Sequence, residues 1–141
     1  MPKSLNPYAE AVFTQLTRDL TIGAALKLDA AKGTSMAVHV EQLTERHYSV
    51  AHYYQQNDDR MADPEMTFYR CEHGRVFPCS YQQDSLGIYR MGLEITELGI
   101  IEGENPKEQA DQADFANVWM KNIAEQQRLT VTVQPEEAHD A

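Results

Sequence analysis

Two Asn-Pro steps, Asn6-Pro7 and Asn105-Pro106, constrain the fold of this 141-residue chain more than any other feature. Asparagine is a favoured helix cap and proline suits the first helical position, so each step predicts the start of a helix. Apolar residues recur every four positions in the first case, which predicts an amphipathic helix over residues 7–20. Phe115, Trp119 and their apolar neighbours line one helical face in the second, which predicts a longer helix over 106–128.

The residues between these helices carry strand patterns at hairpin spacing. Residues 26–28 and 38–40 alternate apolar and polar side chains on either side of the turn-forming segment 31–35, which predicts a hairpin. The first arm also suits a helix, because its alanine, leucine and lysine residues favour helix. Residues 48–54 are rich in β-forming side chains and predict a third strand, which ends at Asn57.

Prolines restrict the strands that follow. Asp63-Pro64 does not suit the inside of a central ladder, so the next strand is predicted to start near Glu65. The next predicted strand, residues 76–81, contains Pro78, which predicts that this strand lies at an edge of the sheet. Apolar positions over 86–95 predict one further strand with an irregularity near Gly92, and the glycines and the Asn-Pro step over 99–106 predict a loop.

Together these patterns predict an α+β fold in one domain. We expect an antiparallel sheet of about five or six short strands, with the N-terminal helix and the long C-terminal helix packed on it. The domain is predicted to span residues 1–129, and residues 130–141 are predicted to form a flexible tail. Apolar residues make up 42% of the chain, which is ordinary for a globular domain.

The sequence favours a reducing, aqueous compartment. No apolar run approaches the roughly 18–20 residues of a membrane helix, and the first ten residues lack the apolar core of a secretory signal. Two cysteines, Cys71 and Cys79, are too few for a disulfide framework and are expected to be thiols. We therefore expect a cytoplasmic protein.

The net charge of −10 is concentrated toward the end of the sequence. Residues 97–141 hold 10 carboxylates against 3 basic residues, and residues 1–96 hold 12 against 9. An acidic surface repels phosphate backbones, which disfavours direct nucleic-acid binding, and it suits a basic protein groove that normally holds DNA or RNA. The alternative is that the excess charge only keeps the protein soluble and monomeric.

Residues 49–66 hold the strongest indication of chemistry. In one interpretation His52 is a general base oriented by Asp63, Asp58 or Glu65, which would make the chain a small enzyme or a ligand-binding domain. In the other, His52 is a hydrogen-bonded histidine of the core or its rim. General-base work needs the imidazole within about 3 Å of the proton, and nothing in the spacing establishes that contact.

Metal motifs are matched poorly. The acids that follow Asn57 lack the glycine and the spacing of an EF-hand loop, so a solvated turn is expected there. Cys71, His73 and Cys79 give three ligands where a structural zinc site takes four, and the first two are too close for the usual knuckle. We expect no metal and no other cofactor.

Tyrosine and acid side chains point to an interaction surface. Six tyrosines lie in the predicted strands, and tyrosine is enriched in protein interfaces. One face of the sheet can lack a helical cover, and Phe115 and Trp119 belong either to the core or to an exposed patch. The residues predicted to contact a partner are Tyr53, Tyr54, Asp58, Asp59, Tyr81, Tyr89, Glu102, Glu104, Glu108, Asp111 and Asp114.

SVAHYYQQNDDRMADPEMTF (49–68), followed by SYQQDSLGIY (80–89), resembles an uncharacterised bacterial domain family of plasmid, phage and integrative-element proteins. The family motif reads Ser-Val/Ile-Ala-His-Tyr, Gln-Asn-Gly-Asp, Met-x-Asp-Pro-Glu-Met and Tyr-Gln-Asn-Asp-x-Leu-Gly-x-Tyr. Asp58 replaces the turn glycine, which argues against a tight primed turn, and Gln83 replaces an asparagine. The matching positions are 49–53, 56–57, 61, 63–66, 81–82, 84, 86–87 and 89.

The resemblance covers about a third of the chain, residues 48–90, and implies a mobile genetic element without implying an activity. With the charge, it leads to a hypothesis of an anti-CRISPR or antirestriction protein, a monomer or dimer that occludes a basic nucleic-acid-binding surface of a host complex. Nucleic acid and membrane are not expected as direct partners. The alternatives are an enzyme or a ligand- or metal-binding domain centred on His52, Asp63 and Glu65, and an accessory protein for plasmid maintenance.

Overall fold

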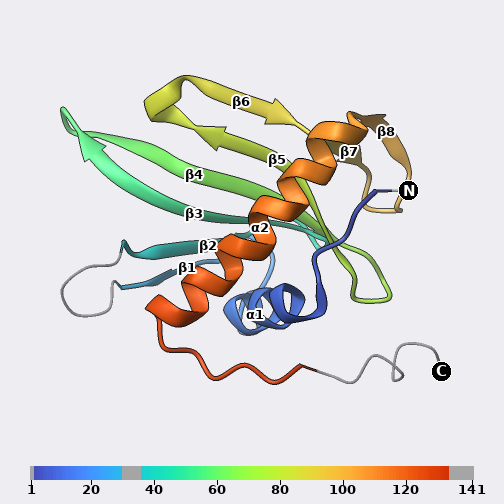
Figure 1. Ribbon diagram of the computed structural model, residues 1–141, viewed down its shortest axis with the longest axis horizontal. Coiled ribbons are helices and arrows are strands. Elements are labelled where there is room, and N and C mark those ends of the chain that lie inside the picture. The colour runs from blue at the N-terminus through green and yellow to red at the C-terminus, as the bar shows by residue number, and fades with distance from the viewer. Residues whose placement is uncertain (1, 30–35, 134–141) are drawn as a thin grey trace.

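Six strands form one antiparallel sheet, and both helices lie on the same face of it (Figure 1). The structure is a computed structural model that describes residues 2–29 and 36–133. The prediction of an α+β fold with a helix at each end of the chain is confirmed. The elements are α1 (Pro7–Thr17), β1 (Ala25–Leu28), β2 (Val38–Gln42), β3 (His47–Gln56), β4 (Asp59–Arg70), β5 (Val76–Gln83), a 3₁₀ turn (Asp84–Leu86), β6 (Ile88–Met91), β7 (Leu93–Ile95), β8 (Ile101–Glu104) and α2 (Pro106–Gln126).

Both helices begin at the Asn-Pro steps, as predicted. The side chain of Asn6 accepts a hydrogen bond from Ala9 N (2.8 Å), and that of Asn105 accepts one from Glu108 N (3.5 Å). These bonds satisfy amide groups that have no partner within the first turn of a helix. α1 ends at Thr17, three residues earlier than the periodicity predicts.

The main core lies between the two helices and the sheet. The ring of Phe13 in α1 lies 5.3 Å from that of Tyr48 in β3 and 5.2 Å from that of Phe68 in β4. Burying an apolar side chain of this size contributes about 1.5–3 kcal/mol. Trp119 of α2 is 6% exposed and belongs to this core, whereas Phe115, on the same predicted stripe, is 40% exposed.

The prediction that a strand starts near Glu65 is wrong, because β4 begins at Asp59 and runs through Pro64. Ala51 pairs with Glu65 and Tyr53 pairs with Ala62, so two residues of β4, Asp63 and Pro64, lie opposite one residue of β3. This is a β-bulge, and a bulge is where a strand tolerates a residue that lacks an N–H.

β5 is also not an edge strand, because β4 and β6 flank it. Pro78 lies beside a second register shift, where Thr67 pairs with Ser80 and Phe68 pairs with Pro78. The pairing of β5 with β6 begins only at Ser80. The proline therefore occupies the part of β5 that has a neighbour on one side only, and the prediction missed that the rest of the strand is interior.

The turn between β3 and β4 is tight despite the missing glycine. Gln56 pairs with Asp59, which leaves a two-residue loop of Asn57 and Asp58. Both loop residues have positive φ, 51° and 69°, as a primed turn requires. The expectation from the Asp58 replacement was therefore wrong.

The single strand predicted over 86–95 is split at Gly92 into β6 and β7, which belong to different sheets. A Cβ on Gly92 would lie 3.0 Å from the backbone of Gln109 in α2, which is closer than most Cβ contacts, so glycine suits this crossing point. β7 pairs with β8, which forms within the predicted loop over 99–106. The predicted turn over 31–35 falls mostly outside the described residues. Of the predicted tail, Val131 packs against the core, and residues 134–141 lie outside the described part.

Candidate interaction surface on the open face of the sheet

The sheet face opposite the helices carries mostly small and polar side chains. One row across this open face pairs Glu41 with Ser49, Ser49 with Thr67, and Thr67 with Ser80. The hydroxyls of Thr67 and Ser80 are hydrogen-bonded (2.5 Å), and Ser49 Oγ donates to Glu65 (2.9 Å). Short side chains in the middle of the row leave a shallow trough, and longer side chains stand at its ends.

The β7–β8 hairpin covers one end of the open face. Beneath it lies a second, smaller core of Tyr69, Cys79 and Leu93, with partly buried apolar neighbours. Burial raises the pKa of the Cys79 thiol to about 12, so this thiol is not an activated nucleophile. The hairpin therefore divides the open face into a covered end and an uncovered trough.

A hollow of about 240 Å³ lies where the trough meets the hairpin. A Cβ on Gly103 would come within 2.8 Å of Glu94 Oε1, so glycine there gives the Glu94 carboxylate room to lie across the hairpin. The side chains that line the hollow include Thr67, Ser80, Tyr89, Met91, Glu94 and Glu102.

A second hollow, of about 180 Å³, lies at the β1–β3 end of the same face. Tyr53 forms its wall, with the ring of His39 at 4.8 Å and the guanidinium of Arg60 4.0 Å above the Tyr53 ring. Burial, and then the carboxylate of Glu65, raises the pKa of the Tyr53 hydroxyl. Burial, followed by the charges of Arg60 and Lys27, lowers the pKa of His39.

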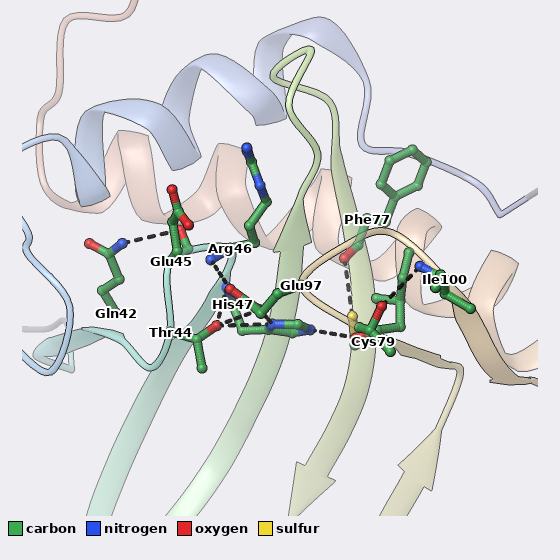
Figure 2. Close-up of polar contacts among 11 residues, drawn as sticks. Gln42, Thr44, Glu45, Arg46, His47, Phe77, Cys79, Glu97 and Ile100 are labelled. Atoms are coloured by element: carbon green, nitrogen blue, oxygen red, sulfur yellow. Dashed lines mark hydrogen bonds and ion pairs between the residues drawn. The ribbon is translucent and has the colours of Figure 1, made fainter.

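His47 ties the hairpin to the sheet. Its Nδ1 contacts a carboxylate oxygen of Glu97, and its Nε2 lies 3.0 Å from the carbonyl oxygen of Ile95. Glu97 also accepts from Thr44 Oγ1 (2.6 Å) and from Arg46 N (3.0 Å). Figure 2 shows the Glu97 carboxylate and the Thr44 hydroxyl converging on the imidazole.

These hydrogen bonds set the charge of Glu97. Burial alone raises the pKa of the Glu97 carboxyl, but the bonds from Thr44, His47 and the Arg46 backbone outweigh it and hold the pKa below the ordinary value. Both ring nitrogens of His47 already face acceptors, so neither is free to take a proton from a substrate. The local sequence gives no signal of this cluster, because His47 and Glu97 lie 50 positions apart.

The structure does not bring His52, Asp63 and Glu65 together. His52 is 8% exposed on the helix side, where its ring lies 5.5 Å from that of Trp119 and its Nδ1 is 3.1 Å from Ala37 O. Glu65 is on the opposite face with Ser49. Asp63 lies at the bulge, near enough to Tyr81 that its charge, after burial, raises the pKa of that hydroxyl. The geometry fits a structural histidine and does not fit a shared catalytic site.

The predicted tyrosines divide between the two faces. Tyr53 and Tyr89 are on the open face, and Tyr89 is 65% exposed. Tyr54 follows the alternation of β3 to the helix side, and Tyr81 packs against Phe115 there (5.3 Å). Only half of the predicted tyrosine surface is therefore available to a partner of the open face.

The predicted acidic residues also differ in their surroundings. In α2, Glu108, Asp111 and Asp114 each lie beside a basic side chain, which is Arg90 (3.7 Å), Lys107 (2.9 Å) and Lys3 (2.5 Å) respectively. Asp58 and Asp59 are exposed at the tip of the β3–β4 hairpin. Within residues 2–29 and 36–133, no ion pair is found for Glu41, Glu65, Glu94, Glu102 or Glu104.

Metal-ligand geometry is absent from the described part of the chain, where no group of three or more His, Cys, Asp or Glu side chains converges. Cys79 is buried beneath the hairpin, while His73 is exposed on the turn between β4 and β5. Among the described residues, no helix is long and apolar enough to cross a membrane.

The fold and the open face define a small two-layer α+β domain with a polar, acid-lined trough. The chain belongs to the family described as a domain of unknown function (DUF6908), whose model matches residues 10–129. Comparison with curated proteins and with solved structures finds no match.

Proposed function

We propose that this protein binds a basic, nucleic-acid-binding surface of a macromolecular complex and occludes it, as an inhibitor of the anti-CRISPR or antirestriction type. The observation that carries the proposal is the set of carboxylates without an ion pair around the open face. They are Glu41, Glu65, Glu94, Glu102 and Glu104.

Physical chemistry favours a cationic partner for this surface. Carboxylates that have no internal cation present their charge to solvent and attract a positive surface over about 10 Å at 0.1 M salt. Tyr89 adds an exposed ring at the hairpin end of the trough, which suits the stem and guanidinium group of an arginine, whereas the Tyr53 ring is already covered by Arg60. A groove that holds DNA or RNA is built from such side chains.

The proposed surface is narrower than the sequence suggests. α2 covers the face opposite the trough, so a flat partner cannot contact both at once (Figure 1). The acids of α2 each have a basic neighbour, whereas Glu65, Glu94 and Glu102 have no ion pair in the described part of the chain. Lys27 and Arg60 line the second hollow beside Glu41, so the negative charge of the open face lies toward the hairpin. We therefore assign docking to the open face and the β7–β8 hairpin.

Two variants with the same change in charge test this assignment. Glu94→Gln with Glu102→Gln removes two charges from the hollow, and Asp111→Asn with Asp114→Asn removes two from α2. After capture of the partner from host lysate and its identification by mass spectrometry, the Kd of each variant is measured. The hollow variant should bind at least about tenfold more weakly and the α2 variant within about twofold of the parent.

Salt provides the second criterion. The affinity should fall as salt rises from 0.1 M toward 1 M, because the Debye length falls from about 10 Å to about 3 Å. An affinity that stays flat, or equal losses for the two variants, contradicts the proposal. If the captured partner is a plasmid protein and not a host defence complex, the protein is an accessory of plasmid maintenance.

A further inference from the structure

The β7–β8 hairpin is joined to the rest of the protein at its base and at its tip. At the base, Gly92 N donates to Cys79 O (2.7 Å) and Asn105 N donates to Gly92 O (3.0 Å). At the tip, the polar contacts with the sheet in the described part of the chain are those that Ile95 and Glu97 make with residues 44–47. β7 and β8 pair with each other and with no strand of the main sheet.

The contacts of His47 at the tip require a doubly protonated ring. Nδ1 faces the carboxylate of Glu97, and Nε2 faces the carbonyl oxygen of Ile95. A carboxylate and a carbonyl only accept hydrogen bonds, so each ring nitrogen has to donate, and only the imidazolium has two N–H groups. Loss of either proton would leave a nitrogen lone pair against an oxygen lone pair in a partly buried position.

No other group around the ring offers a hydrogen-bond donor to an unprotonated Nδ1. Thr44 Oγ1 lies 3.1 Å from Nδ1, but its own proton is donated to Glu97. The Tyr69 ring of β4 lies 5.3 Å from the His47 ring. The titratable and charged side chains on the elements around His47 are Glu45, Arg46, Tyr69, Cys71, Glu72, Cys79, Glu94, Glu97 and Glu102.

We infer that the β7–β8 hairpin is a flap that opens separately from the main sheet, and that the His47 imidazolium paired with the Glu97 carboxylate holds it closed. The closed flap needs the two ring nitrogens of His47 and the Glu97 carboxylate together, so removing either side chain should make the flap open more often.

Cys79 reports the opening of this flap. It is 6% exposed in the small core that the hairpin covers, together with Tyr69 and Leu93. A thiol reagent reacts with the thiolate, and burial keeps Cys79 protonated while the flap is closed. Labelling of Cys79 therefore requires an opening event.

The experiment uses the full chain with Cys71→Ser, so that Cys79 is the remaining thiol. His47→Gln is compared with this parent, and His73→Gln, an exposed histidine of the β4–β5 turn, is the matched control. Dividing the labelling rate of a variant by that of the parent at the same pH cancels the chemistry of the reagent. His47→Gln should label about tenfold faster than the parent, because it removes the paired contacts with Glu97 and Ile95, and His73→Gln should label within about twofold of the parent.

Each other result decides against a part of the inference. A labelling ratio near one for His47→Gln overturns the role of His47, and so does a ratio for His73→Gln that is as large as the ratio for His47→Gln. Labelling that accelerates with urea as steeply as the loss of Trp119 fluorescence overturns separate opening, because it then needs global unfolding. If His47→Gln does not fold, Glu97→Gln gives the same comparison with the same expected rise in ratio.

The flap also carries Glu94 and Glu102, so its opening would remove these carboxylates from the trough. This consequence for partner binding rests on the proposed function. The labelling experiment needs no partner, so it tests the flap even if no partner is found. If the hairpin proves to be rigid, the partner experiment still tests the proposed function.

Discussion

Glu97 shows how one residue couples two distant segments. Its carboxylate lies at the tip of the β7–β8 hairpin and accepts hydrogen bonds from Thr44, Arg46 and His47, which are about 50 positions earlier. The pKa of Glu97 is lowered in the fold, so the folded state favours the ionised form. The stabilisation is therefore complete above the ordinary pKa of 4.5 and is lost as the pH falls through the folded value.

Replacing Glu97 with glutamine should reveal this dependence. At pH 7 we expect the variant to lose about 1 kcal/mol of unfolding free energy, a modest figure because the side chain is more than a third exposed. Urea unfolding at a series of pH values checks the sign, since the gap between parent and variant should close below about pH 4. A gap that widens in acid contradicts the argument. Glu45→Gln, at an exposed position of the turn between β2 and β3, is the control.

Among the helices and strands, those that were predicted well have signals in their own local sequence. The two helix starts and the first three strands follow from caps, turns and periodicity. The errors arise where a contact with a distant element determines the local structure. Pro64 stays in β4 because the bulge against β3 absorbs it, and the chain leaves the sheet at Gly92 because α2 lies against it. The acid-lined hollow and the His47–Glu97 pair depend on the same long-range packing and have no local signature.

The β3–β4 turn gives a prediction at the scale of the helices and strands. Asp58 has φ of 69°, a conformation that costs an ordinary residue about 1 kcal/mol and costs glycine little. Asp58→Gly should therefore raise the unfolding free energy by roughly 0.5–1 kcal/mol, measured by thermal or urea unfolding. Asp58→Ala removes the same charge but keeps the strain, so it should not stabilise the protein. Equal gains for both variants would assign the effect to charge.

At the scale of the whole molecule, Gln109 of α2 joins three parts of the chain. It is 1% exposed, accepts from Lys3 N (2.7 Å), and donates to Lys3 O (2.8 Å) and Pro78 O (3.2 Å). A single side chain therefore fixes the N-terminal segment, α2 and β5 relative to one another.

Removing this side chain should loosen the N-terminal segment first. Gln109→Ala leaves partly buried backbone groups without partners, and we expect a loss of about 2–3 kcal/mol of unfolding free energy. Hydrogen exchange at Leu5, whose amide donates to Val76 O, should accelerate as well. Gln126→Ala, at the exposed end of the same helix, should change neither quantity. Protection at Leu5 that survives Gln109→Ala would show that α1 alone holds the segment.

The pairing of the α2 acids with Lys3, Arg90 and Lys107 has an electrical consequence for the molecule as a whole. Although the second half of the sequence carries most of the negative charge, its longest helix is close to neutral from outside. In the described part of the chain, the open face carries carboxylates without an ion pair, among them Glu65, Glu94 and Glu102. A cationic support should therefore hold the protein by this face more often than by α2, with the helices pointing into solution.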